Sequence, residues 1–224
     1  MLNKIVPTLY DAVSGVRSGS IIMIGGFGAV GQPDALIEGL IDLGVDGLTI
    51  IANNAGSGRT GLARLMELGR VRKIICSFPR QPGSFIFEEL YKRRDIELEI
   101  VPQGTLAERI RAAGAGIGAF FTPTSYGTAL AENKEARQID GEMQVLEFSL
   151  HADVALIEAW RADRWGNLSY RGSGRNFNPV MATAATACIV QAHHIVELGQ
   201  IGPDEIVTPG IYVDRVVTPV AVPH

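Results

Sequence analysis

The chain has 224 residues, of which 46% are hydrophobic and 20% are charged, and its formal net charge at pH 7 is −4. This composition is typical of a globular protein, and we expect one domain over residues 1–224. The net negative charge argues against a general nucleic-acid binder. No apolar run reaches the roughly 18 residues that span a bilayer, so we expect neither nucleic acid nor a membrane as a partner.

The cysteines and the N-terminal residues indicate the cellular compartment. Cys76 and Cys188 lie in apolar, strand-like runs without metal-ligand spacing, which predicts buried free thiols and no metal site. The first residues contain no apolar segment followed by a cleavage site, as a secretory signal would. We therefore expect a cytoplasmic protein.

The first half of the chain alternates between short apolar runs and amphipathic segments. After a first helix near residues 7–17, we predict strands at residues 20–24, 48–52, 73–77 and 97–101, and helices at residues 33–43, 62–68, 84–93 and 105–113. Repeated β–α units of this length predict an α/β fold, a mostly parallel sheet with helices on both faces.

The second half is less regular. We predict strands at residues 152–160, 168–171 and 187–197 and a helix at residues 176–185. No linker rich in Pro, Ser or Gly and no clear internal repeat separates them from the first half. The simplest interpretation is a set of irregular β additions to the same domain.

Four loops with distinctive side chains follow the first four predicted strands, at residues 25–31, 53–56, 77–81 and 102–104. In an open parallel sheet, ligands bind at the carboxyl ends of the strands. The alternation of elements therefore predicts that these four loops converge on one site.

The first of these loops is the most informative segment of the chain. Phe27 is surrounded by Gly25, Gly26, Gly28 and Gly31. Glycine permits positive φ and a close approach of the backbone to a ligand. A loop between a strand and a helix also aims N–H groups at an anion. The loop is predicted to hold a negatively charged or carbonyl-bearing ligand.

Two other interpretations of this loop remain open from the residues alone. Residues 26–31 match the G-x-G-x-x-G pattern, and Asp46 lies about 20 residues further on, as in a dinucleotide site. However, Asp46 precedes the second strand, whereas an acid that binds a ribose should follow it. The other alternative is a tight strand–helix turn without a ligand.

The glycine loop, with Pro33 after it, resembles the signature of family I coenzyme A transferases. Ser18 stands where the family usually has an acidic or amide residue, a small departure that affects turn preference rather than chemistry. The resemblance is to A (alpha) subunits of two-subunit 3-oxoacid CoA-transferases, and within them to the branch that uses 3-oxoadipate and succinate. The blocks that carry it span nearly the whole chain, at residues 53–56, 76–81, 101–111, 121–128, 150–153, 162–168 and 175–178.

The resemblance implies ping-pong transfer of CoA from succinyl-CoA to 3-oxoadipate, with acetoacetate as the alternative acceptor. In the family, a glutamate attacks the thioester and passes through an anhydride to a glutamyl-CoA thioester. That glutamate lies in a Ser-Glu-Asn-Gly type block of the B (beta) subunit, and this chain contains no such block. The implied partner is a B subunit that supplies the glutamate, in an expected heterotetramer. The coenzyme A thioester is then a substrate, and no cofactor is expected to be bound permanently.

Gln103 is the predicted catalytic residue, because its block resembles the family segment whose glutamine donates to the oxyanion. The residues alone favour a local turn role for Gln103. Asn53 and Asn54 offer amide donors at the end of a neighbouring strand, where a β-turn is the alternative. Arg80 is a candidate for the distal carboxylate of 3-oxoadipate, against a surface or interface role. The predicted binding residues are completed by Gly25, Gly26, Phe27, Gly28 and Gly31.

Glu108 is rejected as a nucleophile, because it falls on the surface of a predicted helix. Pairing of Arg109 and Arg111 with Glu108 along that helix is favoured over substrate binding. Two further classes of function stay open: a sugar-phosphate isomerase on a related fold with its own catalytic carboxylates, and a non-catalytic ligand-sensing module.

Overall fold

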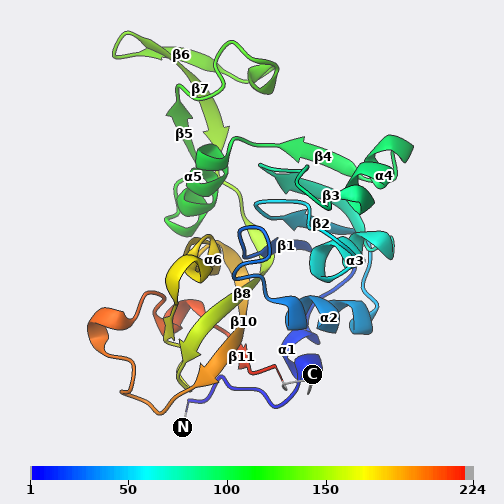
Figure 1. Ribbon diagram of the computed structural model, residues 1–224. Helices are drawn as coiled ribbons and strands as arrows, with labels where there is room; N and C mark the ends of the chain where they lie inside the picture. The colour runs from blue at the N-terminus through cyan, green and yellow to red at the C-terminus, as the bar shows by residue number, and fades with distance from the viewer. Residues whose placement is uncertain (1, 220–224) are drawn as a thin grey trace.

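The computed structural model describes residues 2–219, and its main element is an eight-stranded sheet (Figure 1). The strand order is β11-β10-β8-β1-β2-β3-β4, all parallel, and β9 is antiparallel to β8. The predicted α/β class is therefore confirmed. The strands are β1 (Ile21–Ile24), β2 (Leu48–Ile51), β3 (Val71–Cys76), β4 (Glu97–Ile100), β8 (Ala152–Ala162), β9 (Leu168–Ser169), β10 (Ala185–Ile195) and β11 (Arg215–Val217).

Helices cover both faces of this sheet, as predicted. One face packs against α1 (Leu9–Val13), α2 (Asp34–Leu43), α3 (Gly61–Glu67) and α4 (Phe85–Arg93), and the other against α5 (Gln103–Gly114) and α6 (Asn178–Ala182). Short 3₁₀ helices lie in the loops: η1 (Ala129–Ala131), η2 (Gly172–Arg175), η3 (Pro203–Glu205) and η4 (Gly210–Tyr212). Within residues 2–219, none of the helices has the length and apolar character needed to cross a membrane.

The two apolar layers follow from the alternation of side chains along the strands. In β1, Ile22 and Ile24 pack in the layer of α1–α4, whereas Met23 packs in the layer of α5 and α6. A parallel strand that is buried on both faces must be apolar throughout, which explains why the β1 sequence is a continuous apolar run. β1 is thus packed between the two apolar layers.

The second half of the chain contributes more to the main sheet than we expected. β8 lies beside β1, with Ile24 opposite Leu156, and β10 pairs with β8 from Ala185 to Ile195. These strands continue the parallel sheet rather than adding irregularly to it. The connection between β8 and β10 contains β9, η2 and α6, and α6 is shorter than the helix predicted at residues 176–185.

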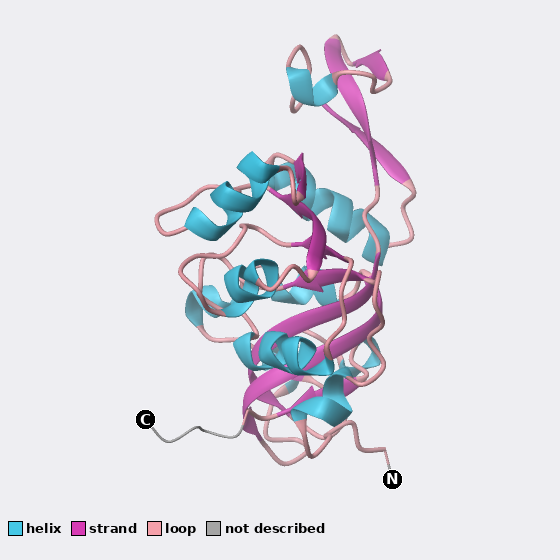
Figure 2. Cartoon of the chain, turned by 90° about the vertical axis from the view of Figure 1, so that its right-hand side faces the viewer, coloured by secondary structure: helices cyan, strands magenta, loops and turns pink. Residues whose placement is uncertain are grey.

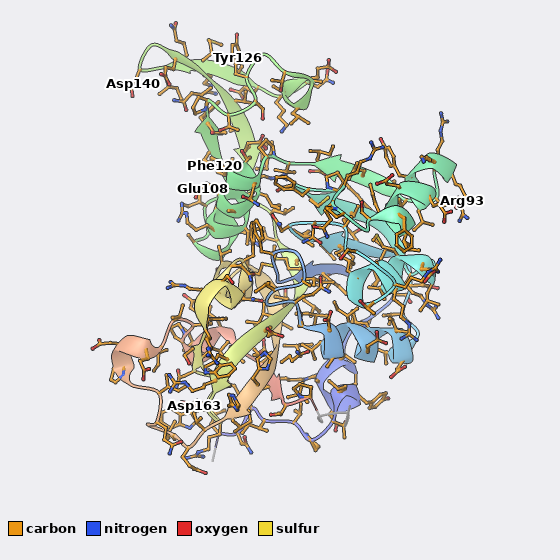
Figure 3. All side chains as sticks on the ribbon, in the orientation of Figure 1. Arg93, Glu108, Phe120, Tyr126, Asp140 and Asp163 are labelled. Carbon is orange, nitrogen blue, oxygen red and sulfur yellow. The ribbon has the colours of Figure 1, made fainter. Side chains whose placement is uncertain are left out.

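The β addition is a separate antiparallel sheet in the order β5-β7-β6, formed by β5 (Ala119–Thr122), β6 (Ala136–Ile139) and β7 (Glu142–Phe148). We call residues 119–148 the arm, because they project from the body in both views (Figure 2). Tyr126 and Asp140 lie toward its far end, and Asp163 lies at the opposite end of the molecule (Figure 3). The strands of the arm were not predicted, because most of their residues are half-buried or exposed and they lack a strong apolar pattern.

An ionic chain, here called the clamp, connects the arm to the body. Glu99 on β4 binds Lys73 at 2.6 Å and Arg109 at 3.1 Å. Arg109 also donates to the backbone carbonyl of Phe148 at 2.8 Å, and Glu147, which is buried, binds Lys134 at 2.6 Å and lies 4.0 Å from Arg109. The clamp therefore joins the body strands β3 and β4 to the arm through α5.

The two cysteines are buried and free, as predicted. Burial raises the pKa of the Cys76 thiol to about 12, although a backbone hydrogen bond from Phe78 opposes the rise. Burial also raises the pKa of Cys188. Thiols with raised pKa values are poor nucleophiles at neutral pH.

Candidate active site

The loops that follow β1, β2 and β3 meet at the carboxyl edge of the sheet, as predicted. The backbone carbonyl of Asn53 accepts a hydrogen bond from the N–H of Ser77 at 3.2 Å. The side chain of Asn54 donates to the Gly28 carbonyl at 3.4 Å and accepts from Gln81 Nε2 at 3.4 Å. The loop after β2 therefore connects the glycine loop to the loop after β3.

Gln103 joins this group from the fourth strand. It is the first residue of α5 rather than a loop residue, and its Nε2 donates to Oδ1 of Asn53 at 2.6 Å. Asn53 is only 3% exposed, so it provides a fixed acceptor. An amide nitrogen carries two hydrogens. Asn53 accepts one of them, and among the hydrogen bonds of residues 2–219 the other has no acceptor.

Gln103 lines a hollow of about 320 Å³ together with Phe27, at the tip of the glycine loop. The remaining lining residues are Gly104, Ala107, Asn176, Phe177 and Val180. The lining contains amide side chains and apolar groups but no charged side chain. Neutral donors beside an apolar wall stabilise negative charge that develops on an oxygen atom, and they do so without titrating. We call this hollow the Phe27 cavity.

The glycine loop forms a tight hairpin around its aromatic residue. The N–H of Phe27 donates to the Val30 carbonyl at 3.0 Å, and the N–H of Val30 donates back at 3.2 Å. Gly26 and Gly28, on either side of Phe27, have φ angles of 127° and 62°, which other residues rarely adopt. The Phe27 side chain is thereby held at the tip, where 52% of it is exposed.

Most N–H groups of the loop have partners within the protein, unlike the free donors that we expected. Gly25 donates to the Leu156 carbonyl at 3.0 Å, and Gly26 donates to Oδ1 of Asn176 at 3.0 Å. Among the hydrogen bonds of residues 2–219, three N–H groups of the loop have no acceptor, those of Gly28, Ala29 and Gly31. Any anion contact by the backbone N–H groups of the loop is therefore confined to Gly28, Ala29 and Gly31.

Arg80 lies apart from the Phe27 cavity. It lines a different hollow of about 300 Å³, whose wall includes Phe78, Tyr91 and Ile100. Its neighbour Gln81 is the residue of this loop that reaches Asn54. The structure thus brings together Gln103, Asn53, Asn54 and the glycine loop, and it leaves Arg80 at an adjoining position.

A third hollow, of about 360 Å³, is lined in part by Val30 and Gly31 of the glycine loop. Glu158 lines it, and burial raises the pKa of this carboxyl group, although His193 at 3.2 Å opposes the rise. Within residues 2–219, no group of three or more His, Cys, Asp or Glu residues is placed to hold a metal ion.

The ion pairs of the two arginines on α5 match our expectation only in part. Arg111 pairs with Glu108, with Nη2 and Oε1 2.6 Å apart, as predicted. Arg109 does not pair with Glu108, because it is part of the clamp. Neither arginine lines the Phe27 cavity.

Asn176 and Asn178 are the functional candidates that the sequence did not single out, although their block was noted. Both side chains bond to the glycine loop across about 150 residues of sequence, since their separations from Gly26 and Gly31 are 150 and 147 residues. The only signal was two asparagines spaced by one residue, a pattern too common to assign a role.

Comparisons with known proteins identify the family of the chain. A sequence model described as Coenzyme A transferase matches residues 6–218. The A subunit of 3-oxoadipate CoA-transferase from Pseudomonas putida is 60% identical over 217 residues, which are 97% of this chain and 94% of that protein. The A subunit of succinyl-CoA:3-ketoacid coenzyme A transferase from Xanthomonas campestris is 52% identical over 90% of this chain and 83% of that protein.

The fold has solved counterparts as well. An acyl-CoA transferase from Escherichia coli O157:H7 superposes with a TM-score of 0.85 at 20% identity. The match covers 96% of this chain but 47% of that chain, so this fold corresponds to about half of the longer polypeptide. The match of the family model over residues 6–218, with relatives of this identity over nearly the full length, shows that the chain belongs to the coenzyme A transferase family.

Proposed function

We propose that the chain is the A subunit of a heteromeric, cytoplasmic CoA-transferase that moves CoA from succinyl-CoA to 3-oxoadipate. The observation that carries this proposal is the amide of Gln103, which Asn53 orients at the edge of the Phe27 cavity with one hydrogen free to donate. The relative at 60% identity, named for 3-oxoadipate, supports the choice of acceptor.

The proposed reaction requires a nucleophile from the partner. The B subunit provides a glutamate whose carboxylate attacks the thioester carbon of succinyl-CoA, and the carbonyl oxygen becomes an oxyanion that accepts the free hydrogen of Gln103. Collapse of this intermediate breaks the C–S bond and yields an acyl-glutamyl anhydride and the CoA thiolate. The thiolate then attacks the glutamyl carbonyl, which forms the glutamyl-CoA thioester and releases succinate.

The second half of the proposed cycle runs these steps in reverse with the new acid. The carboxylate of 3-oxoadipate attacks the glutamyl-CoA thioester and expels the thiolate, giving a mixed anhydride. The thiolate attacks the 3-oxoadipyl carbonyl of that anhydride and restores the glutamate. Gln103 remains a neutral donor throughout, CoA is only a substrate, and no bound cofactor is used.

The lining of the Phe27 cavity supports the need for a partner. None of its lining residues is a carboxylate, and the chain corresponds to about half of the E. coli transferase polypeptide. We propose that the B subunit covers the carboxyl edge of the sheet in a heterotetramer. Obligate interfaces of this kind bury more than roughly 2,000 Å².

Reconstitution tests the proposal. We expect the purified chain alone to form no 3-oxoadipyl-CoA from succinyl-CoA and 3-oxoadipate, and we expect activity when its B subunit is added. Activity of the chain alone would overturn the need for a partner. Turnover of sugar phosphates by the chain alone would favour an isomerase, and ligand binding without transfer in either sample would favour a sensing module.

Acetoacetate is the second candidate acceptor, supported by the 52% identical relative named for 3-ketoacids. The ratio of kcat/KM for the two acceptors in the reconstituted enzyme decides between them. A ratio that favours acetoacetate would replace 3-oxoadipate as the acceptor and leave the rest of the proposal intact.

A further inference from the structure

We infer that Asn176 and Asn178 are positioning residues that fix the shape of the glycine loop and so hold Phe27 opposite Gln103. Neither residue has been given a role in the reaction so far. The effect on catalysis rests on the proposed function, whereas the effect on loop shape does not.

Asn178 ties three parts of the structure together with one side chain. It has 0% exposure. Its Oδ1 accepts from the backbone N–H of Glu158 in β8 at 3.0 Å, and its Nδ2 donates to the carbonyls of Gly31 at 3.0 Å and Gly174 at 2.9 Å. Loss of a buried amide that satisfies backbone groups is costly, so the end of the glycine loop is fixed against the sheet.

Gly25 shows that the loop and Asn178 are fitted to each other. A Cβ atom at residue 25 would lie 1.8 Å from Oδ1 and 2.7 Å from Cγ of Asn178. The φ angle of Gly25 is not in the positive range, unlike those of Gly26 and Gly28. Gly25 is therefore required for space rather than for backbone conformation, and the space is occupied by the Asn178 amide.

Asn176 holds the loop at two points on either side of the hairpin. Its Oδ1 accepts from the N–H of Gly26 at 3.0 Å, and its Nδ2 donates to the Val30 carbonyl at 3.0 Å. It also lines the Phe27 cavity. Because Phe27 lies between Gly26 and Val30, which both bond to Asn176, a shift of Asn176 is expected to move Phe27 relative to Gln103.

A double-mutant cycle in the reconstituted enzyme tests the fit between Gly25 and Asn178. Gly25→Ala alone must displace the Asn178 amide, and we expect kcat to fall by on the order of tenfold to a hundredfold, the effect of a misplacement of about 1 Å. In the Asn178→Ala background the added methyl group meets no amide, so Gly25→Ala should cost less than about twofold more, a strong departure from additivity. Equal costs in both backgrounds would overturn the inference.

Hydrogen exchange of the full chain gives a readout that does not depend on activity. We expect Asn176→Ala and Asn178→Ala to speed amide exchange in residues 25–31, whereas the control Asn167→Ala should leave it unchanged. Asn167 bonds to Gly210 and Asp163, away from the glycine loop. The Asn176→Ala enzyme should lose kcat with little change in KM for succinyl-CoA, and the Asn167→Ala enzyme should keep its kcat even where its melting temperature falls.

Enzyme kinetics and hydrogen exchange together distinguish a failure of the proposed function from a failure of the positioning role. An inactive wild-type complex whose loop exchange still responds to Asn176→Ala would refute the proposed function and support the positioning role. Unchanged exchange in both asparagine variants would refute the positioning role, whatever the activity.

Discussion

At the residue scale, the proposed chemistry depends on the orientation of the neutral side-chain amide of Gln103. Gln103 contacts Asn53, which lies 50 residues earlier in the chain, at 2.6 Å. The sequence pointed to Gln103 as a donor but not to its orientation, because the contact joins residues at the ends of β2 and β4, which β3 separates in the sheet. The turn role that the residues alone favoured is replaced by the first turn of α5.

Gln103→Ala tests this role directly. Removal of one oxyanion donor typically costs on the order of 10²–10³ in kcat. We expect a loss of this size in the reconstituted enzyme with KM little changed, because the bond strengthens mainly in the transition state. Gln103→Glu should lose more, since a carboxylate repels both the oxyanion and the attacking glutamate. A kcat within about threefold of wild type for Gln103→Ala, against that expected loss, would place the oxyanion donors elsewhere. Gln138→Ala on the arm is the matched control.

Arg80 is the second residue with a specific expectation. We propose that its guanidinium, in the hollow beside Phe78, binds the distal carboxylate of 3-oxoadipate when the partner closes over the edge of the sheet. Arg80→Ala should then raise KM for 3-oxoadipate much more than KM for acetoacetate, which has no second carboxylate. Steady-state kinetics with both acceptors measures this difference, and equal changes would assign Arg80 to a structural or CoA-binding role.

At the scale of elements, the clamp explains how the arm keeps its position on the body. Burial raises the pKa of Glu99, but hydrogen bonds and charges from Lys73 and Arg109 outweigh burial, and the net pKa lies below its ordinary value of 4.5. The ionised form is therefore the one that the folded state stabilises. This stabilisation is present above about pH 4.5, the ordinary value, and is lost as the pH falls through the lowered pKa of the folded protein.

Glu99→Gln should remove this pH dependence. We expect a lower melting temperature than wild type at pH 7 and a smaller difference at pH 3, with faster amide exchange in the arm. The Glu99 side chain is 35% exposed, so each pair is worth no more than ~1 kcal/mol. Glu97→Gln on the same strand is the control, because the Glu97 pair with Arg72 is longer, at 3.4 Å, and more exposed. An equal effect of both substitutions at pH 7 would contradict a special role of Glu99.

The sequence predicted some elements better than others for physical reasons. β1–β4 and the helices between them were predicted to within a few residues. β1 and β2 are nearly continuous apolar runs, β4 alternates between acidic and apolar residues, and α2 ends at Gly44, whose φ is 78°. The arm was missed, because its strands pair with each other and bury little apolar surface. The glycine loop was predicted from its residues, whereas its fixation by Asn176 and Asn178 requires the fold.

At the scale of the whole molecule, the open feature is the carboxyl edge of the sheet. Helices cover both faces, but the Phe27 cavity opens at this edge, and no carboxylate lines it. The molecule therefore presents donors, an apolar wall and a fixed aromatic ring to whatever covers the edge. Because this edge supplies donors and an apolar wall while no carboxylate lines the cavity, we expect activity only when a partner is present.

The strand order also determines when this edge is completed during folding. β1 finds its neighbour β2 after a short connection, but its other neighbour, β8, begins more than 100 residues later, with Ile22 opposite Val154. Contacts that close long loops form late, because the chain must lose more entropy before they contribute. Asn176 and Asn178 are synthesised later still. A ribosome-bound chain can therefore build β1–β4 while its glycine loop still lacks a fixed shape, and competence to receive a partner arrives only after Asn176 and Asn178 have been added.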